Sequence, residues 1–585
     1  MRASASLLAV AAVAAAAVPS AHASSPPTSV GRDGAAATVD TLATQAAIDA
    51  LKRGGNATDA AVTAAAVLGV TEPFSCGIGG GGFMVSYDAT KQKVTTIDHR
   101  ERAPVAMTPT SFFQNGVPLT FDDARFSGLS VGVPGTLAGW QMALQRHGTV
   151  SLAKALAPAI AIARDGFVVD QTFADQIDAN VGRFDDVPAT AALYLDPDGT
   201  PLDVGTVFRN PDLAATYALI AKHGLKPFYD GKIARAIVET VRTPPVAQDA
   251  DHTWRPGTMT AADLRAYTAK PRPPVHTTYR GYDVFGMGPP SSGGSTVAEA
   301  LNILEGYTLA GMSRVNVLHR ELEASRYAFA DRGAYVADPD YYAVPLAGLL
   351  SKDFAATRRA LIDPAAAAIS PVAPGDPAPY NGGGAATGQA SVTSMRAGST
   401  THISVVDRHR DVVSYTFTIE STGGSGLVVP QYGFLLNNEL TDFNYDSTTH
   451  PNRVQGGKRP RSSISPTIVL RGGKPRLTLG SPGGSTIITT VLGLLVDRLD
   501  LGRSLPEAIA APRASQRNTP ATSAEPAFIS SPEAPGLQAL GHVFSPMPEI
   551  GAATGVDILG RGVFQAAAEP VRRGGGSALV VTPSP

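Results

Sequence analysis

The sequence contains a single cysteine, Cys76, so no disulfide can form within its 585 residues. We interpret this thiol as a small buried hydrophobic side chain. Charge of one sign is not in excess, because the formal net charge is −2 with 17% charged residues. Neither nucleic acid nor an anionic membrane surface is therefore the expected partner. No His and Cys residues stand at the spacing of a metal site, so no metal or other cofactor is expected.

Long hydrophobic runs are also missing. The apolar stretch at residues 7–18 is well short of the ~20 residues that span a bilayer, and no later segment is long and apolar enough. It follows Arg2 and precedes Ala21-His22-Ala23, which is the order of a secretory signal with an A-x-A cleavage site. We expect residues 1–23 to be removed, leaving a periplasmic or secreted protein without a stable membrane anchor. An uncleaved anchor is the less favoured alternative.

The sequence is instead rich in glycine and proline, with 60 and 46 residues, which is typical of a loop-rich extracytoplasmic enzyme. Its length predicts two to four domains or one large α/β body. Apolar periodicity predicts helices at 41–53, 56–69, 152–165 (interrupted at Pro158), 297–304, 319–331 and 486–499, and strands at 83–87, 94–98, 467–470, 476–479, 563–567 and 578–581. Strands on both sides of residue 400, with helices beside them, indicate a layered α/β fold.

The most informative feature is the transition at Ser399-Thr400. Residues 363–399 are dominated by Ala, Pro, Gly and Ser without apolar periodicity, so we expect a flexible segment. Near alternation of apolar and polar residues follows at once, which predicts a half-buried strand. A cut before Thr400 would explain this order. The new terminal residue would carry a hydroxyl nucleophile together with a free α-amine as its base.

A hairpin that turns at residues 408–410 would place Thr400 directly opposite Thr418. Opposed side chains lie about 5 Å apart on one face of a sheet, so Thr418 could orient the Thr400 hydroxyl. The alternative is a pair of ordinary β-branched strand residues. His402 falls on the same face, where a structural histidine is favoured over a second base.

Two turns are rich in glycine. Residues 77–82 formally match G-x-G-x-x-G, but the order here is helix, loop, strand, whereas a dinucleotide site needs strand, loop, helix. We interpret this turn as close backbone packing, which leaves a Rossmann oxidoreductase as a distant alternative. Residues 480–485 lead into a helix, and their amides could hold an oxyanion with help from the helix dipole.

Several charged residues could bind an α-amino acid. Arg100 could pair with its carboxylate, and the three acids Glu420, Glu439 and Asp442 could pair with its ammonium group. The alternative is a surface cluster of ion pairs around Arg100 and solvated positions for the three acids.

Taken in order, these stretches resemble the γ-glutamyltransferases (γ-glutamyltranspeptidases), a family of N-terminal-nucleophile hydrolases, over nearly the whole chain after residue 23. The landmarks are Gly54-Gly55-Asn56-Ala57-Thr58-Asp59-Ala60-Ala61, Arg100-Glu101-Arg102-Ala103-Pro104, Thr400-Thr401-His402, Leu435-Leu436-Asn437-Asn438, Ser462-Ser463-Ile464-Ser465-Pro466 and Gly480-Ser481-Pro482-Gly483-Gly484-Ser485. Each landmark alone is modest, but six of them in order are highly specific.

The resemblance implies an α+β fold, a four-layer αββα sandwich shared by two fragments of one precursor. The chain would cut itself between Ser399 and Thr400 into a large subunit, 24–399, and a small catalytic subunit, 400–585, which stay together as a heterodimer. The implied donors are glutathione and related γ-glutamyl compounds, with water or an amino acid or peptide as acceptor.

The resemblance also implies roles for individual residues. Thr400 would be the nucleophile of both self-cleavage and catalysis, and Thr418 would support it. Gly483 and Gly484 would form the oxyanion hole. Arg100, with Ser462 and Ser463, would bind the α-carboxylate of the substrate. Glu439 and Asp442 would bind its α-ammonium group.

The chain departs from the family pattern at two places. Glu420 stands where many members have Asn, and its carboxylate could still bind the ammonium group. The stretch from Asp442 to Ser462 is short for a lid, so we expect hydrolysis to be favoured over transfer and bulkier acyl groups to fit. One alternative is a related acylase for glutaryl side chains of β-lactams, and another is an uncleaved, inactive secreted binding protein on this fold.

Overall fold

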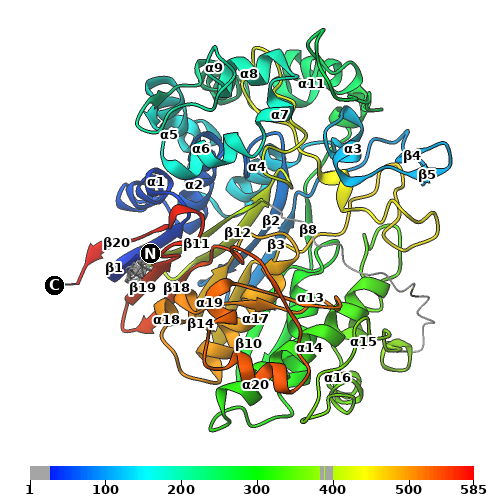
Figure 1. Cartoon of the computed structure of the whole chain (residues 1–585). Coiled ribbons are helices and arrows are strands. Elements are labelled where there is room, and N and C mark those ends of the chain that lie inside the picture. Colours follow the sequence, from blue (N-terminus) through cyan, green and yellow to red (C-terminus); the bar gives the residue numbers. More distant parts are fainter. Residues whose placement is uncertain (1–26, 383–387, 389–398, 585) are drawn as a thin grey trace, which may run out of the picture.

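The computed structural model describes residues 27–382, 388 and 399–584. Its centre is a 13-stranded antiparallel sheet (Figure 1). The strands run in the order β8 (Lys270–Arg272), β3 (Lys93–Asp98), β2 (Gly81–Asp88), β12 (Val412–Thr418), β11 (Thr401–Asp407), β1 (Thr28–Thr38), β19 (Val563–Ala568), β18 (Thr554–Gly560), β14 (Lys474–Gly480), β13 (Thr467–Arg471), β10 (Tyr282–Gly286) and β9 (Val275–Tyr279), with β20 (Ser577–Pro583) also paired to β1.

The sheet folds over so that its two halves lie face to face. The Ser414 hydroxyl on β12 donates a hydrogen bond of 3.1 Å to the Leu479 carbonyl on β14 and accepts one of 2.9 Å from the Thr467 amide on β13. These strands are far apart in the sheet order, so the bonds must cross between two layers. The two halves therefore form the inner layers of a sandwich.

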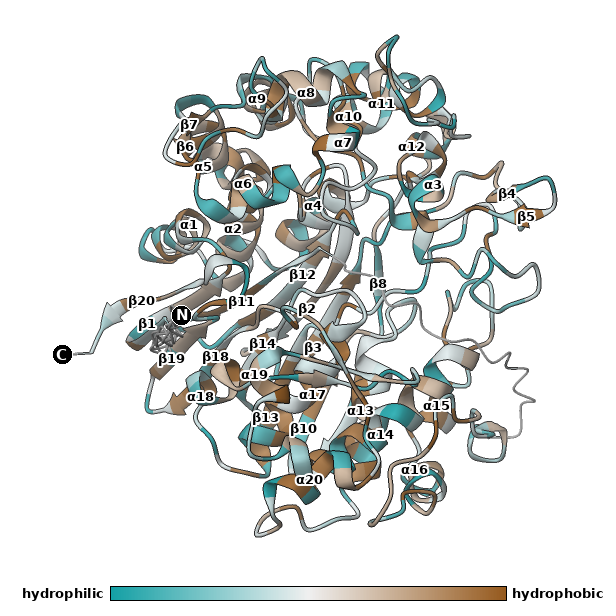
Figure 2. Cartoon of the chain, in the orientation of Figure 1, coloured by the Kyte–Doolittle hydropathy of each residue, from teal (hydrophilic) through white to brown (hydrophobic). Residues whose placement is uncertain are grey.

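Helices cover both outer faces (Figure 1). Beside β11 and β12 lie α1 (Thr41–Lys52), α2 (Ala57–Thr71), α4 (Thr136–His147), α5 (Leu152–Asp165), α9 (Pro211–His223) and α11 (Lys232–Arg242). Beside β13 and β14 lie α13 (Gly293–Leu304), α14 (Arg314–Tyr335), α17 (Thr486–Leu499) and α18 (Leu505–Ala510). Figure 2 shows hydrophobic residues concentrated along the strands and the helices packed on them. The expected αββα sandwich of the α+β class is confirmed.

Shorter elements surround this body. The helices are α3 (Phe121–Arg125), α6 (Gln171–Asp178), α7 (Val181–Phe184), α8 (Pro188–Tyr194), α10 (Lys226–Asp230), α12 (Ala261–Arg265), α15 (Leu346–Leu349), α16 (Lys352–Arg359), α19 (Pro526–Ile529) and α20 (Ala534–Ala539), with 3-10 turns η1 (Gly128–Ser130), η2 (Ala378–Tyr380), η3 (Glu439–Asp442) and η4 (Arg572–Gly574). The short strands are β4 (Phe113–Gln114), β5 (Val117–Pro118), β6 (Phe167–Val168), β7 (Val207–Phe208), β15 (Ala514–Ser515), β16 (Thr522–Ala524) and β17 (Phe544–Pro546).

The hairpin of β11 and β12 has the predicted register. Thr401 pairs with Phe417 and Val406 with Val412, which places Thr400 opposite Thr418. The prediction of a half-buried strand was wrong, because every residue of both strands is buried. The polar positions of the alternating pattern face the other half of the sandwich, where they find hydrogen-bond partners instead of solvent.

Helix α5 also differs from the prediction. It runs without interruption from Leu152 to Asp165 although it contains Pro158. A proline removes one backbone hydrogen bond, but Leu156 and Ala159 on either side of it are buried in the core. This packing holds the two turns together as one helix.

The structure describes only part of the segment that was expected to be flexible, residues 363–399. Residues 363–382 are tied to the body by amide donors: Ala367 to the Leu540 carbonyl (2.6 Å), Ala368 to Glu323 (3.1 Å), Val372 to Asn518 (2.7 Å) and Gly375 to Asp331 (2.5 Å). The prediction was therefore wrong for residues 363–382, since polar partners elsewhere replace the missing apolar face. Its remaining part, apart from Gly388 and Ser399, lies outside the described residues, as does the expected signal at 1–23.

No helix within the described ranges is long and apolar enough to cross a bilayer.

The glycine turn before β2 has the packing role that its element order predicted. A Cβ atom on Gly79 would come within 2.0 Å of the Leu435 carbonyl oxygen, and one on Gly80 within 2.0 Å of the Thr418 carbonyl oxygen. Cys76 beside this turn is buried, as expected.

Candidate active site

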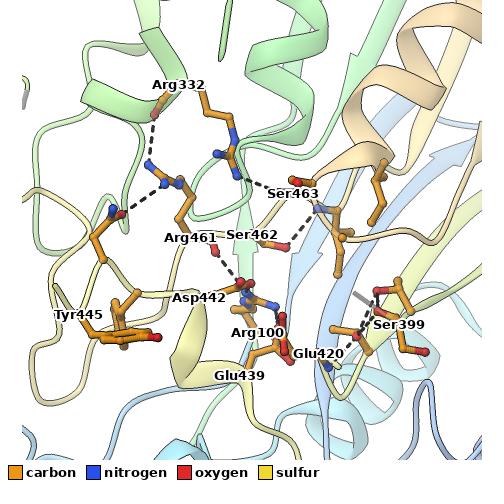
Figure 3. Close-up of a pocket in the computed structure, with 18 of the residues that line it drawn as sticks. Arg100, Arg332, Ser399, Glu420, Glu439, Asp442, Tyr445, Arg461, Ser462 and Ser463 are labelled. Atoms are coloured by element: carbon orange, nitrogen blue, oxygen red, sulfur yellow. Dashed lines mark hydrogen bonds and ion pairs between the residues drawn. The ribbon is translucent and has the colours of Figure 1, made fainter. Parts of the chain in front are cut away.

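A cavity of about 280 Å³ opens where the start of β11 meets η3 and the turn before α17. Figure 3 shows its lining residues converging from both halves of the sandwich. Ten of the eleven predicted site residues line it: Arg100, Ser399, Thr400, Thr418, Glu420, Glu439, Asp442, Ser462, Ser463 and Gly484. The eleventh, Gly483, lines a neighbouring pocket that also contains Ser399. Residues more than 380 positions apart in the sequence thus meet at one place.

The hydroxyl of Thr400 lies against the peptide bond that precedes it. Its Oγ1 donates a hydrogen bond to the Ser399 carbonyl oxygen and lies 3.2 Å from Thr418 Oγ1. Thr418 Oγ1 in turn donates to the same carbonyl oxygen at 3.1 Å and accepts from the Glu420 amide at 2.8 Å. The predicted pair of threonines therefore surrounds the Ser399 carbonyl, one as a potential nucleophile and the other as a donor to its oxygen.

A second group on the other side of Thr400 was not predicted from the sequence. Arg573 donates from Nη1 to the Thr400 carbonyl oxygen at 2.6 Å and forms an ion pair of 3.1 Å with Glu72. Burial raises the pKa of Glu72 to about 7, while Arg573 opposes the rise. The Ser399 hydroxyl donates to Ser75 Oγ at 2.8 Å, and Ser75 also bonds to Arg573. No local pattern marks these residues, because they come from the two ends of the chain.

Arg100 is a fully buried charge of the cavity. Its guanidinium pairs with Glu439 and with Asp442, the latter at 2.5 Å, and its side chain is 1% exposed. The alternative of a surface ion-pair cluster is therefore wrong. Burial opposes the charge of Arg100, but the two carboxylates raise its pKa overall. Asp442 has a side chain that is 30% exposed, against 1% for Glu439, so Asp442 is the more accessible of these two acids.

Glu101 adds a carboxyl group behind this ion pair. Burial raises its pKa to about 8, while Arg100 opposes the rise. Burial also raises the pKa of Glu439. Both carboxyl groups therefore favour the neutral form more than an exposed glutamate does, and Arg100 opposes this tendency.

Glu420 is held at the cavity edge in an unusual backbone conformation, with φ of +81°. Its Oε2 accepts hydrogen bonds from the Ser421 hydroxyl and from Asn438 Nδ2, both at 2.5 Å. The carboxylate is fixed by these two donors and remains one of the residues that line the cavity. It therefore adds negative charge on the side of Glu439.

The turn before α17 is built to expose backbone amides. Gly483 has φ of +129° and Gly484 φ of +58°, a region in which only glycine is unstrained. Neither amide donates a hydrogen bond to another residue in the described part of the chain. Both stand just before the N-terminus of α17, where the helix dipole favours negative charge. The turn can therefore stabilise an oxyanion beside Thr400.

His402 has the structural role that was favoured for it. It is fully buried, and its ring nitrogens lie 2.7 Å from Thr416 Oγ1 and 3.0 Å from Ser404 Oγ. Burial lowers its pKa to about 3, so the ring is neutral at physiological pH. It supports the hairpin through these two contacts.

Comparisons with known proteins agree with this geometry. Residues 43–579 match the family model for gamma-glutamyltranspeptidase. The chain is 39% identical over 553 residues to a glutathione hydrolase proenzyme of Bacillus subtilis (strain 168), covering 93% of this chain and 91% of that protein. It is 35% identical over 494 residues to the Acylase ACY 1 proenzyme of Pseudomonas sp. (strain SE83), covering 83% and 82%. A solved cephalosporin acylase from Bacillus halodurans superposes with a TM-score of 0.82 at 27% identity, covering 98% and 99%.

The αββα sandwich with a threonine at the start of a buried central strand defines an enzyme of the N-terminal-nucleophile hydrolase class. Within that class the match over residues 43–579 and the close relatives show the family directly. This chain belongs to the γ-glutamyltranspeptidase family.

Proposed function

We propose that this chain is the precursor of a γ-glutamyltransferase and glutathione hydrolase that cleaves itself between Ser399 and Thr400. The observation that carries the proposal is the contact of the Thr400 hydroxyl with the Ser399 carbonyl, completed by the Thr418 hydroxyl. Self-cleavage would yield a large subunit, 24–399, and a small subunit, 400–585. They would remain a heterodimer because β1 pairs with β11, β19 and β20 across the two fragments.

This geometry supports the following route of self-cleavage. Thr400 Oγ1 adds to the carbonyl carbon of Ser399, and Thr418 donates a hydrogen bond to the oxygen as it gains negative charge. The bond between Ser399 and the nitrogen of Thr400 then breaks, and this nitrogen takes up the hydroxyl proton. Water hydrolyses the resulting ester to a Ser399 carboxylate. Thr400 is left with a free α-amine.

Turnover would use the same residue. The free α-amine of Thr400 accepts the proton of its own hydroxyl, which attacks the γ-carbonyl of the donor. The amides of Gly483 and Gly484 hold the oxyanion, and one such donor is typically worth about 3 kcal/mol. The γ-glutamyl group passes to Thr400 as an ester while the amine of the donor leaves. Water then releases glutamate, or an amino acid or peptide accepts the γ-glutamyl group.

The cavity would recognise the donor by its two charged groups. Arg100 with Ser462 and Ser463 would bind the α-carboxylate, while Asp442 and the acids behind it would bind the α-ammonium group. In the structure these opposite charges pair with each other. A bound α-amino acid would offer each of them a new partner of opposite sign without leaving a buried charge unpaired.

The support from Thr418 can be tested by Thr418→Val, which keeps the shape of the side chain but removes the hydroxyl. We expect self-cleavage to slow by at least about tenfold, because the Ser399 carbonyl loses a donor and Thr400 loses a hydrogen-bond partner. Gel densitometry of the precursor against time after synthesis measures the rate. Thr418→Ser retains the hydroxyl and should cleave close to the wild-type rate. Equal rates for the Val and Ser variants would contradict the assigned role.

A related acylase for glutaryl side chains is the second candidate, favoured by the acylase among the relatives. The two functions differ in whether the α-ammonium group of the donor matters. We expect the purified enzyme to release p-nitroaniline from γ-glutamyl-p-nitroanilide at least about tenfold faster than from its desamino analogue, glutaryl-p-nitroanilide, because Asp442 loses its partner with the latter. A faster reaction with the glutaryl compound would favour the acylase.

The same assay with glycylglycine separates hydrolysis from transfer. Residues 443–446 line the cavity directly after η3, and the stretch up to Ser462 contains no helix or strand within the described residues. This short segment supports the proposal that water competes well with amine acceptors.

N-terminal sequencing of the mature protein would place the cut of the proposed signal peptide and the internal cut in one experiment. Fractionation would then test the proposed periplasmic or secreted location.

A further inference from the structure

The wall of the cavity next to Ser462 and Ser463 contains an arginine that the sequence did not single out. Arg332 lies in the last turn of α14, is 4% exposed, and lines the cavity. Its Nη2 donates to Ser463 Oγ at 2.8 Å and its Nε to Ser292 Oγ at 2.7 Å. Figure 3 shows Arg332 and Arg461 on the side of the cavity where Ser463 lies. Arg332 thus stands directly behind a residue expected to bind the donor.

The direction of the hydrogen bonds at the two serines is informative. Ser463 Oγ accepts from Arg332, and Ser462 Oγ accepts from the Ile464 amide at 3.1 Å. Arginine has no acceptor, so the hydroxyl proton of Ser463 must point elsewhere. Both serine hydroxyls are thereby left with their protons to donate. A carboxylate, which only accepts hydrogen bonds, is the matching ligand.

Arg332 also keeps the main chain of this pair in place. The hydroxyl of Ser292, which accepts from Arg332, donates at 2.5 Å to the carbonyl oxygen of Ser462. The Ser292 amide donates to the same oxygen at 2.8 Å. The planar guanidinium therefore fixes Ser462 through Ser292 and Ser463 directly. A lysine would have to make both bonds from a single nitrogen, because it lacks the rigid fork that here donates from Nε to Ser292 and from Nη2 to Ser463.

The charge of this wall points the same way. Arg100 is already balanced by Glu439 and Asp442. Burial and the positive charges of Arg461 and Arg517 lower the pKa of Arg332, while Asp442 opposes this shift. Two arginines and one carboxylate thus act on Arg332. A carboxylate placed at the two serines would add a second negative charge beside these arginines.

We propose that Arg332 is a positioning residue for the α-carboxylate of the donor: it orients the Ser463 hydroxyl toward that group, holds the main chain of Ser462 through Ser292, and places positive charge behind both serines. This inference rests on the proposed function, because it takes the carboxylate to be that of the γ-glutamyl group. It assigns the second cationic group of the site to the large subunit, whereas both serines belong to the small subunit.

The test compares Arg332→Lys and Arg332→Gln with wild type on three anilides. γ-Glutamyl-p-nitroanilide has both charged groups, glutaryl-p-nitroanilide keeps only the carboxylate, and 4-aminobutyryl-p-nitroanilide keeps only the amine. We expect kcat/KM to fall by about tenfold for Lys and by more for Gln on the first two substrates, mainly through KM. For the third substrate we expect a change of less than about twofold. Inhibition constants of glutarate and 4-aminobutyrate give the same comparison where turnover is slow.

Arg326→Lys is the matched control, because Arg326 is a buried arginine of the same helix that pairs with Glu323 away from the cavity. The Arg326→Lys substitution should change kcat/KM by the same factor on all three substrates. Ser463→Ala should reproduce the substrate pattern of Arg332→Lys even if an Arg332 variant folds poorly. Equal losses on all three substrates for Arg332→Lys, or no loss, would overturn the inference. A wild-type enzyme inactive on both γ-glutamyl and glutaryl anilides would instead overturn the proposed function.

Discussion

Thr400→Ala is expected to give a single uncut chain without activity. The variant keeps the strand, since residue 400 precedes β11, but it has no hydroxyl to attack the Ser399 carbonyl. Without the cut no free α-amine arises, so both the nucleophile and its base are lost at once. A denaturing gel should show one band, and release of p-nitroaniline from γ-glutamyl-p-nitroanilide should fall to background. Thr400→Ser keeps a hydroxyl and should still cleave.

The neighbouring residue provides the matched control. Thr401 is a buried threonine whose hydroxyl has no hydrogen-bond partner among the described residues. Thr401→Ala should therefore be cut and remain active. If Thr400→Ala were cut at the same peptide bond, or were active, the self-cleaving mechanism would be wrong. An uncut wild-type protein without activity would instead favour the inactive binding protein on this fold.

Arg100→Gln is expected to have the second largest effect. It removes the cation that pairs with Glu439 and Asp442, and with it the expected partner of the substrate carboxylate. Loss of one partner from a buried charge pair typically costs about 2–5 kcal/mol, so kcat/KM on γ-glutamyl-p-nitroanilide should fall by roughly one and a half to three and a half powers of ten. The loss should be smaller for 4-aminobutyryl-p-nitroanilide, which has no carboxylate.

The variant should also lose stability in a pH-dependent way. Glu101 already has its pKa raised by burial to about 8, with Arg100 opposing the rise. Without Arg100 the pKa values of Glu101 and Glu439 rise further above those of the unfolded chain. Ionising these groups then costs folding free energy, so stability should decrease as pH rises from 5 through 8. Thermal unfolding at these pH values measures the effect, and the difference from wild type should be smallest at pH 5.

Arg459→Gln is a matched control for this experiment. Arg459 is a buried arginine paired with Asp98, and it does not line the cavity. It should lower stability without the selective loss on substrates that carry a carboxylate. Equal changes in kcat/KM for the two arginine variants on all substrates would contradict a direct role of Arg100 in binding.

The hairpin at residue 400 could be predicted from the sequence because its determinants are local. The turn and the period of two fix the register, and register alone places Thr400 opposite Thr418. The helix α17 was predicted with both ends correct for the same reason, since its apolar run begins after a glycine turn. Local patterns do not report what packs on the outer side of a strand. For this reason the strand that was expected to be half-buried is fully buried in the structure. They also misjudged residues 363–382, whose partners lie on other elements.

What the sequence by itself determined is the set of reactive and charged residues and their order along the chain, including the nucleophile. Only the tertiary structure decided which of them meet. It joined Arg100 to Glu439 and Asp442, and it brought Arg332 to the cavity. It also placed Arg573, paired with Glu72, at the Thr400 carbonyl, although no spacing had indicated these residues. The physical reason is that sequence periodicity reports neighbours within one element, whereas ion pairs and donor directions at this site arise between elements that the sandwich stacks together.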